Sequence, residues 1–237
     1  KAKLFINGGG SLIQDVTSSR SLYFYLFTLR AARALGCRVA MYGCGIGPIM
    51  SSANRKIAAG ILNRTAEIIT LRDSMSFELL KEMKVDKPEI ILTADPVNIV
   101  KSSPLAVRAA FDSEKIPAEE KKIGFCLRNW PTFFQFEEMA AAAEYAYHTY
   151  GATPVFLPIE TPRDIEAAHK VTGFMRVPYY ICRRKHSVED LIGMLGSMEA
   201  VVGMRLHALL FATAGGAPVV RISSDVKVDS FIKDMGS

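Results

Sequence analysis

Residues 200–222, AVVGMRLHALLFATAGGAPVVRI, contain two apolar strand-like runs with a helix-like run between them. The runs Ala200–Val202 and Val219–Ile222 are wholly or almost wholly apolar, as expected of strands that are buried on both faces. Between them, Leu206–Ala214 has the composition of a buried helix, and two glycines follow it. A strand, a helix and a second strand in this order predict a parallel βαβ unit.

The same alternation runs through the rest of the chain. In the first half we expect strands at residues 3–7, 39–42, 68–71 and 90–93, with helices at 22–35, 53–64 and 74–83. In the second half we expect further strands at residues 123–127, 155–157 and 179–182, with helices at 137–150, 164–171 and 188–195. The sequence therefore predicts an α/β protein with two Rossmann-like domains, each built on a parallel sheet.

Residues 100–122 interrupt this alternation with two prolines and the charged run AEEKK, around one short helical stretch at 106–111. We therefore expect an N-terminal domain over residues 1–103, a linker over 104–122 and a C-terminal domain over 123–237. The chain starts with Lys1 instead of methionine, and a strand follows at once without a signal-peptide pattern. We expect the natural start of the first domain to be missing from this sequence.

Composition limits the function classes. Hydrophobic residues make up 49% and charged residues 22% of the 237, and no apolar run is long enough to cross a membrane. The net charge of +5 divides into +6 for residues 1–103 and −1 for residues 104–237. A basic first half suits an anionic partner such as a phosphorylated substrate or a membrane surface, but it lacks the Lys/Arg clusters of nucleic-acid binding. The four cysteines form no C-x-x-C pair, so we expect no metal site.

Three loops of the first half follow predicted strands, where ligands of α/β sheets gather. The segment NGGGSLIQD brings Gly8, Gly9, Gly10, Ser11 and Asp15, the segment GCGIGPI brings Gly45, and the segment RDSMS brings Arg72. Glycines let backbone amides approach a ligand closely, but they also simply allow tight turns. The spacing matches neither a dinucleotide-binding fingerprint nor a P-loop, so both interpretations stay open.

Cations follow the strands of the second half. Arg128 ends one strand, two residues before the only tryptophan, Trp130, and it could grip an anion or sit in a surface salt bridge. Arg205 and His207 are two residues apart, so they can converge only if Arg205 lies in the turn before the helix. That helix start, with its free amides, favours an anion. After the last strand, the segment RISSDVKVDSF adds two further candidates, Ser223 and Lys227.

Three segments together resemble the polysaccharide pyruvyl transferase family: NGGGSLIQDVTSSRSLYFYL, MYGCGIGPI with the following NR, ITLRD and TADP, and GMRLHALLFATAGGAPVVRISSDVKVDSF. The first segment is similar to the subgroup that pyruvylates secondary cell-wall polymers in bacteria with S-layers. The resemblance implies a glycosyltransferase-B-like fold, phosphoenolpyruvate as donor, and a pyruvate ketal formed across two sugar hydroxyls. It implies an N-acetylmannosamine unit of a lipid-linked precursor as acceptor, and a cytoplasmic location at the inner face of the cell membrane.

The resemblance also implies roles for individual residues. The family's strand-end arginine falls on Arg128, its late lysine on Lys227, and its donor-binding Arg-Leu-His block on Arg205, Leu206 and His207. Phosphoenolpyruvate carries a phosphate and a carboxylate, so we expect Arg128, Arg205 and Lys227 to clamp these anions. His207, an imidazole that ordinarily titrates near neutral pH, is the candidate acid/base. No metal and no cofactor are implied. The family's glycine-rich opening segment is absent here.

Two alternatives remain open. A sugar transferase of the same fold with a nucleotide-sugar donor would need a ribose-binding carboxylate in the second half, for which Glu160 is the candidate. A glycan-binding module without catalysis would bind sugar but release no phosphate. Further along the chain, we expect His186 to lie in a solvated basic loop, and Ser187 and Asp190 to form a capping box at the next helix.

Overall fold

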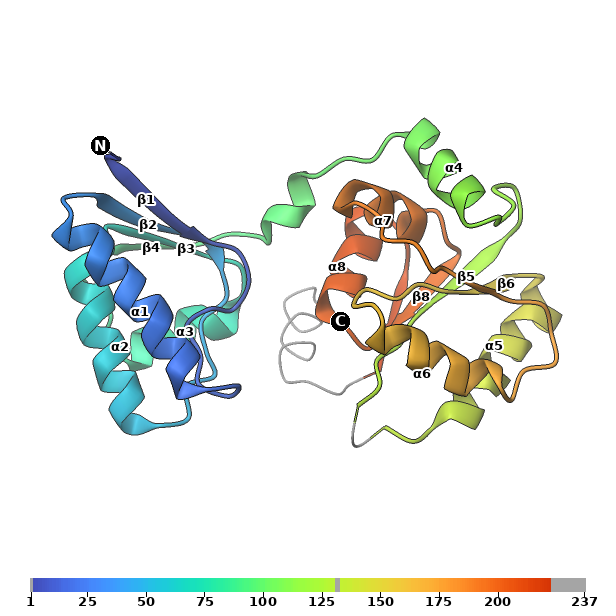
Figure 1. The fold of residues 1–237 in the computed structure, drawn as a ribbon, viewed down its shortest axis with the longest axis horizontal. Coiled ribbons are helices and arrows are strands. Elements are labelled where there is room, and N and C mark those ends of the chain that lie inside the picture. Colours follow the sequence, from blue (N-terminus) through green and yellow to red (C-terminus); the bar gives the residue numbers. More distant parts are fainter. Residues whose placement is uncertain (1, 131–132, 223–237) are drawn as a thin grey trace. The chain divides into compact units, whose positions relative to one another are not determined.

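The computed structural model describes residues 2–130 and 133–222. They form two compact units, the first ending at Pro96 and the second beginning at Val97, and each is described by itself (Figure 1). No helix within the described residues is long and apolar enough to span a membrane.

The first unit is a four-stranded parallel sheet covered by three helices. Its strands, in the order in which they pair, are β1 Leu4–Gly8, β2 Arg38–Cys44, β3 Ile68–Leu71 and β4 Glu89–Leu92. Its helices are α1 Ser19–Ala34, α2 Ser52–Thr65 and α3 Ser74–Glu82. Each predicted strand and helix of this half is present, with boundaries shifted by at most a few residues.

All three helices of this unit lie on one side of its sheet (Figure 1). The chain moves one strand further in the same direction at every step, and right-handed crossovers then place each helix on the same face. That face forms the core, in which Leu22, Leu62 and Ile69 are fully buried. Strand side chains that alternate to the opposite face stay exposed, among them Leu4 and Ile6.

The second unit is a five-stranded parallel sheet with helices on both faces. Its strands are β5 Lys122–Cys126, β6 Thr153–Phe156, β7 Tyr180–Ile181, β8 Ala200–Gly203 and β9 Val219–Arg221, paired in the order β7-β6-β5-β8-β9. Its helices are α4 Pro104–Ser113, α5 Phe136–Tyr150, α6 Arg163–Thr172, α7 Val188–Gly196 and α8 Leu206–Ala214, preceded by a short 3-10 helix at Pro96–Ile99.

The direction of winding reverses inside this second sheet. The chain runs outward from β5 through β6 to β7, then crosses back to β8 and continues to β9. Helices α5 and α6 therefore cover one face, while α7 and α8 cover the other (Figure 1). The reversal makes the boundary between β5 and β8 the switch point, where open α/β sheets form a crevice at the carboxyl ends of their strands.

Residues 104–122, expected as a linker, pack into the second unit. Helix α4 begins at Pro104, and the side chain of Ser103 caps it by accepting a hydrogen bond from the amide of Ala106. It packs against α7, and Phe111 is 2% exposed within the core. The apolar face of this short helix explains the packing, because burying apolar side chains against α7 stabilises the folded chain, whereas a solvated linker would leave them in water. The predicted capping box of Ser187 and Asp190 is confirmed at the start of α7.

Candidate functional site

Two cationic residues follow neighbouring strands at the carboxyl edge of the second sheet. Strands β5 and β8 pair with Cys126 opposite Gly203, and Arg128 and Arg205 each follow two residues after these positions. Met204 joins the two turns: its amide donates to the carbonyl of Cys126 at 3.1 Å, and its sulfur accepts from the amide of Arg128 at 3.4 Å. The structure thus brings the backbones of both predicted donor-binding turns together.

Arg205 lies before the helix, as its convergence with His207 requires. It is the N-cap of α8, with an extended backbone (φ −103°, ψ 132°), and the helix starts at Leu206. Leu206 is partly buried against the core, whereas His207 is exposed in the first helical turn. The ring of His207 lies 6.0 Å from the ring of Phe211, one turn further along.

The side chain of Arg205 is held by two carboxylates that the sequence did not indicate as its partners. Nε donates to Oδ2 of Asp164 at 2.8 Å, and Nη2 donates to Oδ1 of the same residue at 2.7 Å. Nη2 also donates to Oε2 of Glu160 at 2.8 Å. Asp164 is 1% exposed and accepts further hydrogen bonds from the amides of Ile159 and Glu160. The pair therefore ties the β6–α6 loop to the β8–α8 turn.

This arrangement fixes both the charge and the direction of the guanidinium. Burial alone would lower the pKa of Arg205, but the hydrogen bonds and charges of Asp164 and Glu160 outweigh burial and raise this pKa above its ordinary value. Arg205 is therefore a permanent cation, oriented by Asp164. None of the described residues accepts a hydrogen bond from its Nη1, so this nitrogen can donate to a ligand.

Arg128 is positioned by an aromatic ring. Its guanidinium carbon lies 3.9 Å from the ring centroid of Trp130, a cation–π stack. Trp130 packs in turn against the core beneath α5. Next to the stack, Lys170 donates to the side-chain oxygen of Asn129 at 3.0 Å. The predicted partners Ser223 and Lys227 lie outside the described residues, so their part in this site stays a prediction.

In the first unit, the structure brings four predicted loop residues together at the carboxyl edge of its sheet. The amide of Gly45 donates to the carbonyl of Gly10 at 2.9 Å. Arg72 donates from Nη1 to Asp95 at 2.6 Å, in an ion pair of which both side chains are at most 10% exposed. Its Nη2 lies 3.3 Å from Oγ of Ser11. The cluster presents hydroxyl, amide and guanidinium groups, with the charge of Arg72 balanced by Asp95.

Two physical reasons require glycines at this edge: some positions leave no room for a Cβ, and others have a positive φ. A Cβ on Gly45 would lie 2.7 Å from Oγ of Ser11, so any side chain would displace the hydroxyl. Gly9 and Gly10 have φ of 76° and 63°, which side chains disfavour. A Cβ on Gly8 would press against the carbonyl of Tyr42 at 3.2 Å. These close approaches keep the turn compact, which is needed both for a simple tight turn and for a loop whose amides approach a ligand.

Asp15 has a structural task apart from that cluster. Its carboxylate accepts from the amides of Met50 and Ser51 and from the side chain of Asn54, at the start of α2. Burial opposes ionisation, but these hydrogen bonds, led by that of Met50, outweigh it and lower the pKa of Asp15. The carboxylate thus binds the residues at the start of α2 and holds the glycine-rich loop against this helix.

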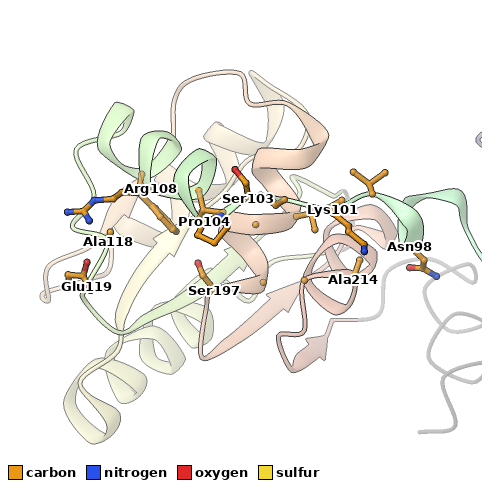
Figure 2. Close-up of a pocket in the computed structure, with 17 residues that line it drawn as sticks. Asn98, Lys101, Ser103, Pro104, Arg108, Ala118, Glu119, Ser197 and Ala214 are labelled. Carbon is orange, nitrogen blue, oxygen red and sulfur yellow. The ribbon is translucent and has the colours of Figure 1, made fainter.

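A cavity of about 750 Å³ lies at the opposite, amino-terminal edge of the second sheet, between α4 and the ends of α7 and α8. Figure 2 shows Arg108 and Glu119 at one end of it, and Lys101 and Asn98 at the other. Because it lies away from the carboxyl ends of β5 and β8, it is separate from the crevice that holds Arg128 and Arg205.

Comparison with known proteins identifies the family. The family model of polysaccharide pyruvyl transferases matches residues 1–226, nearly the whole chain. The chain belongs to the polysaccharide pyruvyl transferase family. The carboxyl edge of β5 and β8 is the candidate functional site of its second unit.

Solved structures share the fold of this chain at low identity. A structure from Listeria monocytogenes, provisionally assigned as a UDP-N-acetylglucosamine 2-epimerase, matches with a TM-score of 0.63 and 13% identity, over 96% of this chain and 59% of its own. HepE from Anabaena in complex with UDP-glucose matches with a TM-score of 0.53 and 14% identity, over 90% of this chain and 60% of its own.

UDP-GlcNAc 2-epimerase from Neisseria meningitidis, bound to UDP-GlcNAc, matches with a TM-score of 0.56 and 11% identity, over 98% of this chain and 68% of its own. Likeness at these identities shows the fold alone, which is glycosyltransferase-B-like with two parallel sheets. The chain spans 60% of the length of HepE and 59% of that of the Listeria protein.

One expectation about the histidines of this chain is wrong in part. Residues 183–185 of the basic loop are exposed, as expected, but the side chain of His186 is only 7% exposed, and its Nε2 lies 2.8 Å from Oε1 of Glu114. Glu114 also accepts from the amides of Arg183 and Arg184, so the basic turn wraps around a buried carboxylate. The basic side chains of this run are exposed, as the sequence indicates, but the sequence gives no sign that its backbone amides bind a buried carboxylate.

Proposed function

We propose that this chain transfers a pyruvyl group from phosphoenolpyruvate to two hydroxyls of a sugar, forming a pyruvate ketal. The family match over residues 1–226 carries this proposal. The geometry of the second unit supports it, because Arg128, Arg205 and His207 come from neighbouring turns at the switch point of the sheet. A donor with a phosphate and a carboxylate needs cations at such a place.

The reaction balances with the donor and one sugar alone. A proton adds to C3 of phosphoenolpyruvate, which makes C2 electrophilic, and the oxygen of the first hydroxyl bonds to C2 as that hydroxyl loses its proton. The C2–O bond to phosphate then breaks, and the second hydroxyl closes the ketal while its proton leaves with inorganic phosphate. His207, exposed at the start of α8, is the group we assign to proton transfer at this centre.

Arg205 and Arg128 bind the donor in this proposal. Arg205 keeps its Nε and Nη2 on Asp164 and Glu160, and it offers Nη1 to one anionic group of the donor. Arg128, stacked on Trp130, binds the other. Lys227 and Ser223 complete the clamp in the proposal, as the family resemblance implies.

We assign the acceptor to the glycine-rich edge of the first unit. There Gly10, Ser11 and Gly45 surround Arg72, whose charge Asp95 already balances. A neutralised arginine next to a hydroxyl suits hydroxyl-bearing ligands better than a second anion. The proposed acceptor is N-acetylmannosamine in a lipid-linked precursor of a secondary cell-wall polymer that anchors S-layers. That places the enzyme in the cytoplasm, at the inner face of the membrane.

The test offers the chain phosphoenolpyruvate together with synthetic lipid-linked acceptors, and follows the mass of the acceptor and the release of phosphate. The proposal expects the acceptor to gain one pyruvyl group for each phosphate released. The competing function is sugar transfer from a nucleotide-sugar, since HepE and the Neisseria epimerase hold UDP-sugars on this fold. Protection from thermal unfolding by UDP-GlcNAc but not by phosphoenolpyruvate, with no pyruvyl gain, would establish that competitor instead.

A further inference from the structure

Charge is segregated on the two longest helices of the first unit. From Val16 to Ala66 the chain contains no Asp or Glu at all, whereas it contains the cations Arg20, Arg30, Arg33, Arg38, Arg55, Lys56 and Arg64. This stretch comprises α1 and α2, which pack against each other. The charged side chains of α1 and α2 are therefore all basic, and carboxylates reach them only from outside the two helices, where Glu67 pairs with Arg33 and Glu82 with Arg55.

Aromatic side chains stand on the outer face of α1. Tyr23, Phe24 and Phe27 are 44%, 60% and 65% exposed, although α1 also buries an ordinary apolar face against the sheet. The stripe is flanked by Arg20 and Arg30, which lie three residues before Tyr23 and three after Phe27. At helical spacing these side chains share one outward face. Exposed aromatic rings between arginines are typical of a surface that meets a partner.

A basic hollow continues this stripe between the two helices. A cavity of about 460 Å³ is lined by Arg30, Arg33 and Arg64 with apolar side chains between them. Arg33 pairs with Glu67 at 2.7 Å. Within the part of the chain that the structure describes, neither Arg30 nor Arg64 forms an ion pair. Arg30 and Arg64 line one hollow, and no carboxylate is among its lining residues. Such a site fits an anionic group such as a phosphate diester.

We infer that this α1–α2 face, defined by Tyr23, Phe24, Phe27, Arg30 and Arg64, docks on an anionic lipid bilayer. The aromatic rings would enter the headgroup region, while the arginines bind lipid phosphates. Charge complementarity favours this occupant over a second copy of the chain, because two such faces would bring arginines against arginines. The inference rests on this face alone and not on the pyruvyl chemistry, so binding is measured without any substrate.

The experiment measures partition of the whole chain to vesicles of phosphatidylcholine, with and without phosphatidylglycerol. We expect binding only to the anionic vesicles and a steep loss as salt rises. Each arginine removed should weaken binding about fivefold, so R30Q/R64Q should bind roughly 25-fold more weakly at low salt. F24S/F27S should lose about tenfold or more of the binding that persists at high salt.

Matched controls come from other surfaces. R108Q and F174S change an exposed arginine and an exposed phenylalanine of the second unit, and should leave binding unchanged. I6S tests the exposed sheet face of the first unit. Loss of binding in I6S but not in the helix variants would overturn the inference, and so would vesicle binding that none of the helix variants weakens. Sedimentation of the chain without vesicles tests whether this face binds a second copy of the chain instead. Helix variants that dissociate an oligomer yet bind vesicles normally would also overturn the inference.

Discussion

The guanidinium of Arg205 holds both carboxylate oxygens of Asp164, with Nε 2.8 Å from Oδ2 and Nη2 2.7 Å from Oδ1. This pair connects the start of α8 to the first turn of α6. Arg205 therefore has a structural task besides any contact with a donor. A substitution of Arg205 should therefore lower the stability of the chain as well as its activity, and both are measured for each variant.

The first prediction concerns the stability that this pair provides. Because each substitution strands a buried charge, R205Q and D164N should each lower the free energy of unfolding by about 3 kcal/mol. The double variant should be more stable than the sum of the two losses by about 2 kcal/mol. Urea unfolding of the four proteins measures this cycle. R163Q, which breaks only the exposed pair of Arg163 and Glu160, should cost less than about 0.5 kcal/mol. Strictly additive losses would show that the pair does not act as a unit.

The second prediction uses Glu160, whose side chain is 46% exposed beside Arg205. Its charge opposes an anionic donor, so E160Q should lower the dissociation constant of phosphoenolpyruvate about two- to fivefold. If the donor were a nucleotide-sugar whose ribose is held by Glu160, the same substitution would weaken binding of that donor. Calorimetric titration of both ligands separates the two functions. E166Q, a change at an exposed glutamate of α6, should alter neither affinity.

The course of the chain could be predicted from sequence because nearly every buried strand is a short apolar run between helical periods. The partner of Arg205 could not be predicted from sequence, since Asp164 lies 41 positions earlier and the contact depends on the conformation of two loops. An acidic residue in the first turn of a helix that follows a strand was the available signal, but it is equally typical of an ordinary helix start. The packing of α4 was missed for a related reason, because prolines and charges concealed the burial of Phe111.

The third prediction concerns pH and the buried carboxylate of Glu114. Burial alone would raise the pKa of Glu114, but the amides of Arg183 and Arg184, followed by His186, outweigh burial and lower it below the ordinary 4.5. A lowered pKa means that the stabilisation is fully present above pH 4.5 and is lost as the pH falls through the folded-state value.

E114Q should therefore cost about 2 kcal/mol at pH 7, because the amide group cannot accept all of these hydrogen bonds. The difference from the wild type should shrink at pH 3, where Glu114 of the wild type becomes protonated. Unfolding free energies at both pH values test this. E78Q, at an exposed glutamate of α3, should show little difference at either pH. A gap for E114Q that widens in acid would contradict the assigned direction of the shift.

The last prediction concerns His207, which is exposed in the first turn of α8 directly after Arg205. If this imidazole transfers the proton at C3 of the donor or at a sugar hydroxyl, H207N should lower kcat by about 10²- to 10⁴-fold. Its affinity for phosphoenolpyruvate should change little, because Arg128 and Arg205 remain in place. H169N, at an exposed histidine near the end of α6, should keep wild-type turnover. Undiminished phosphate release by H207N with acceptor present would assign the proton transfer to another group, and a parallel loss of donor affinity would make His207 a binding residue instead.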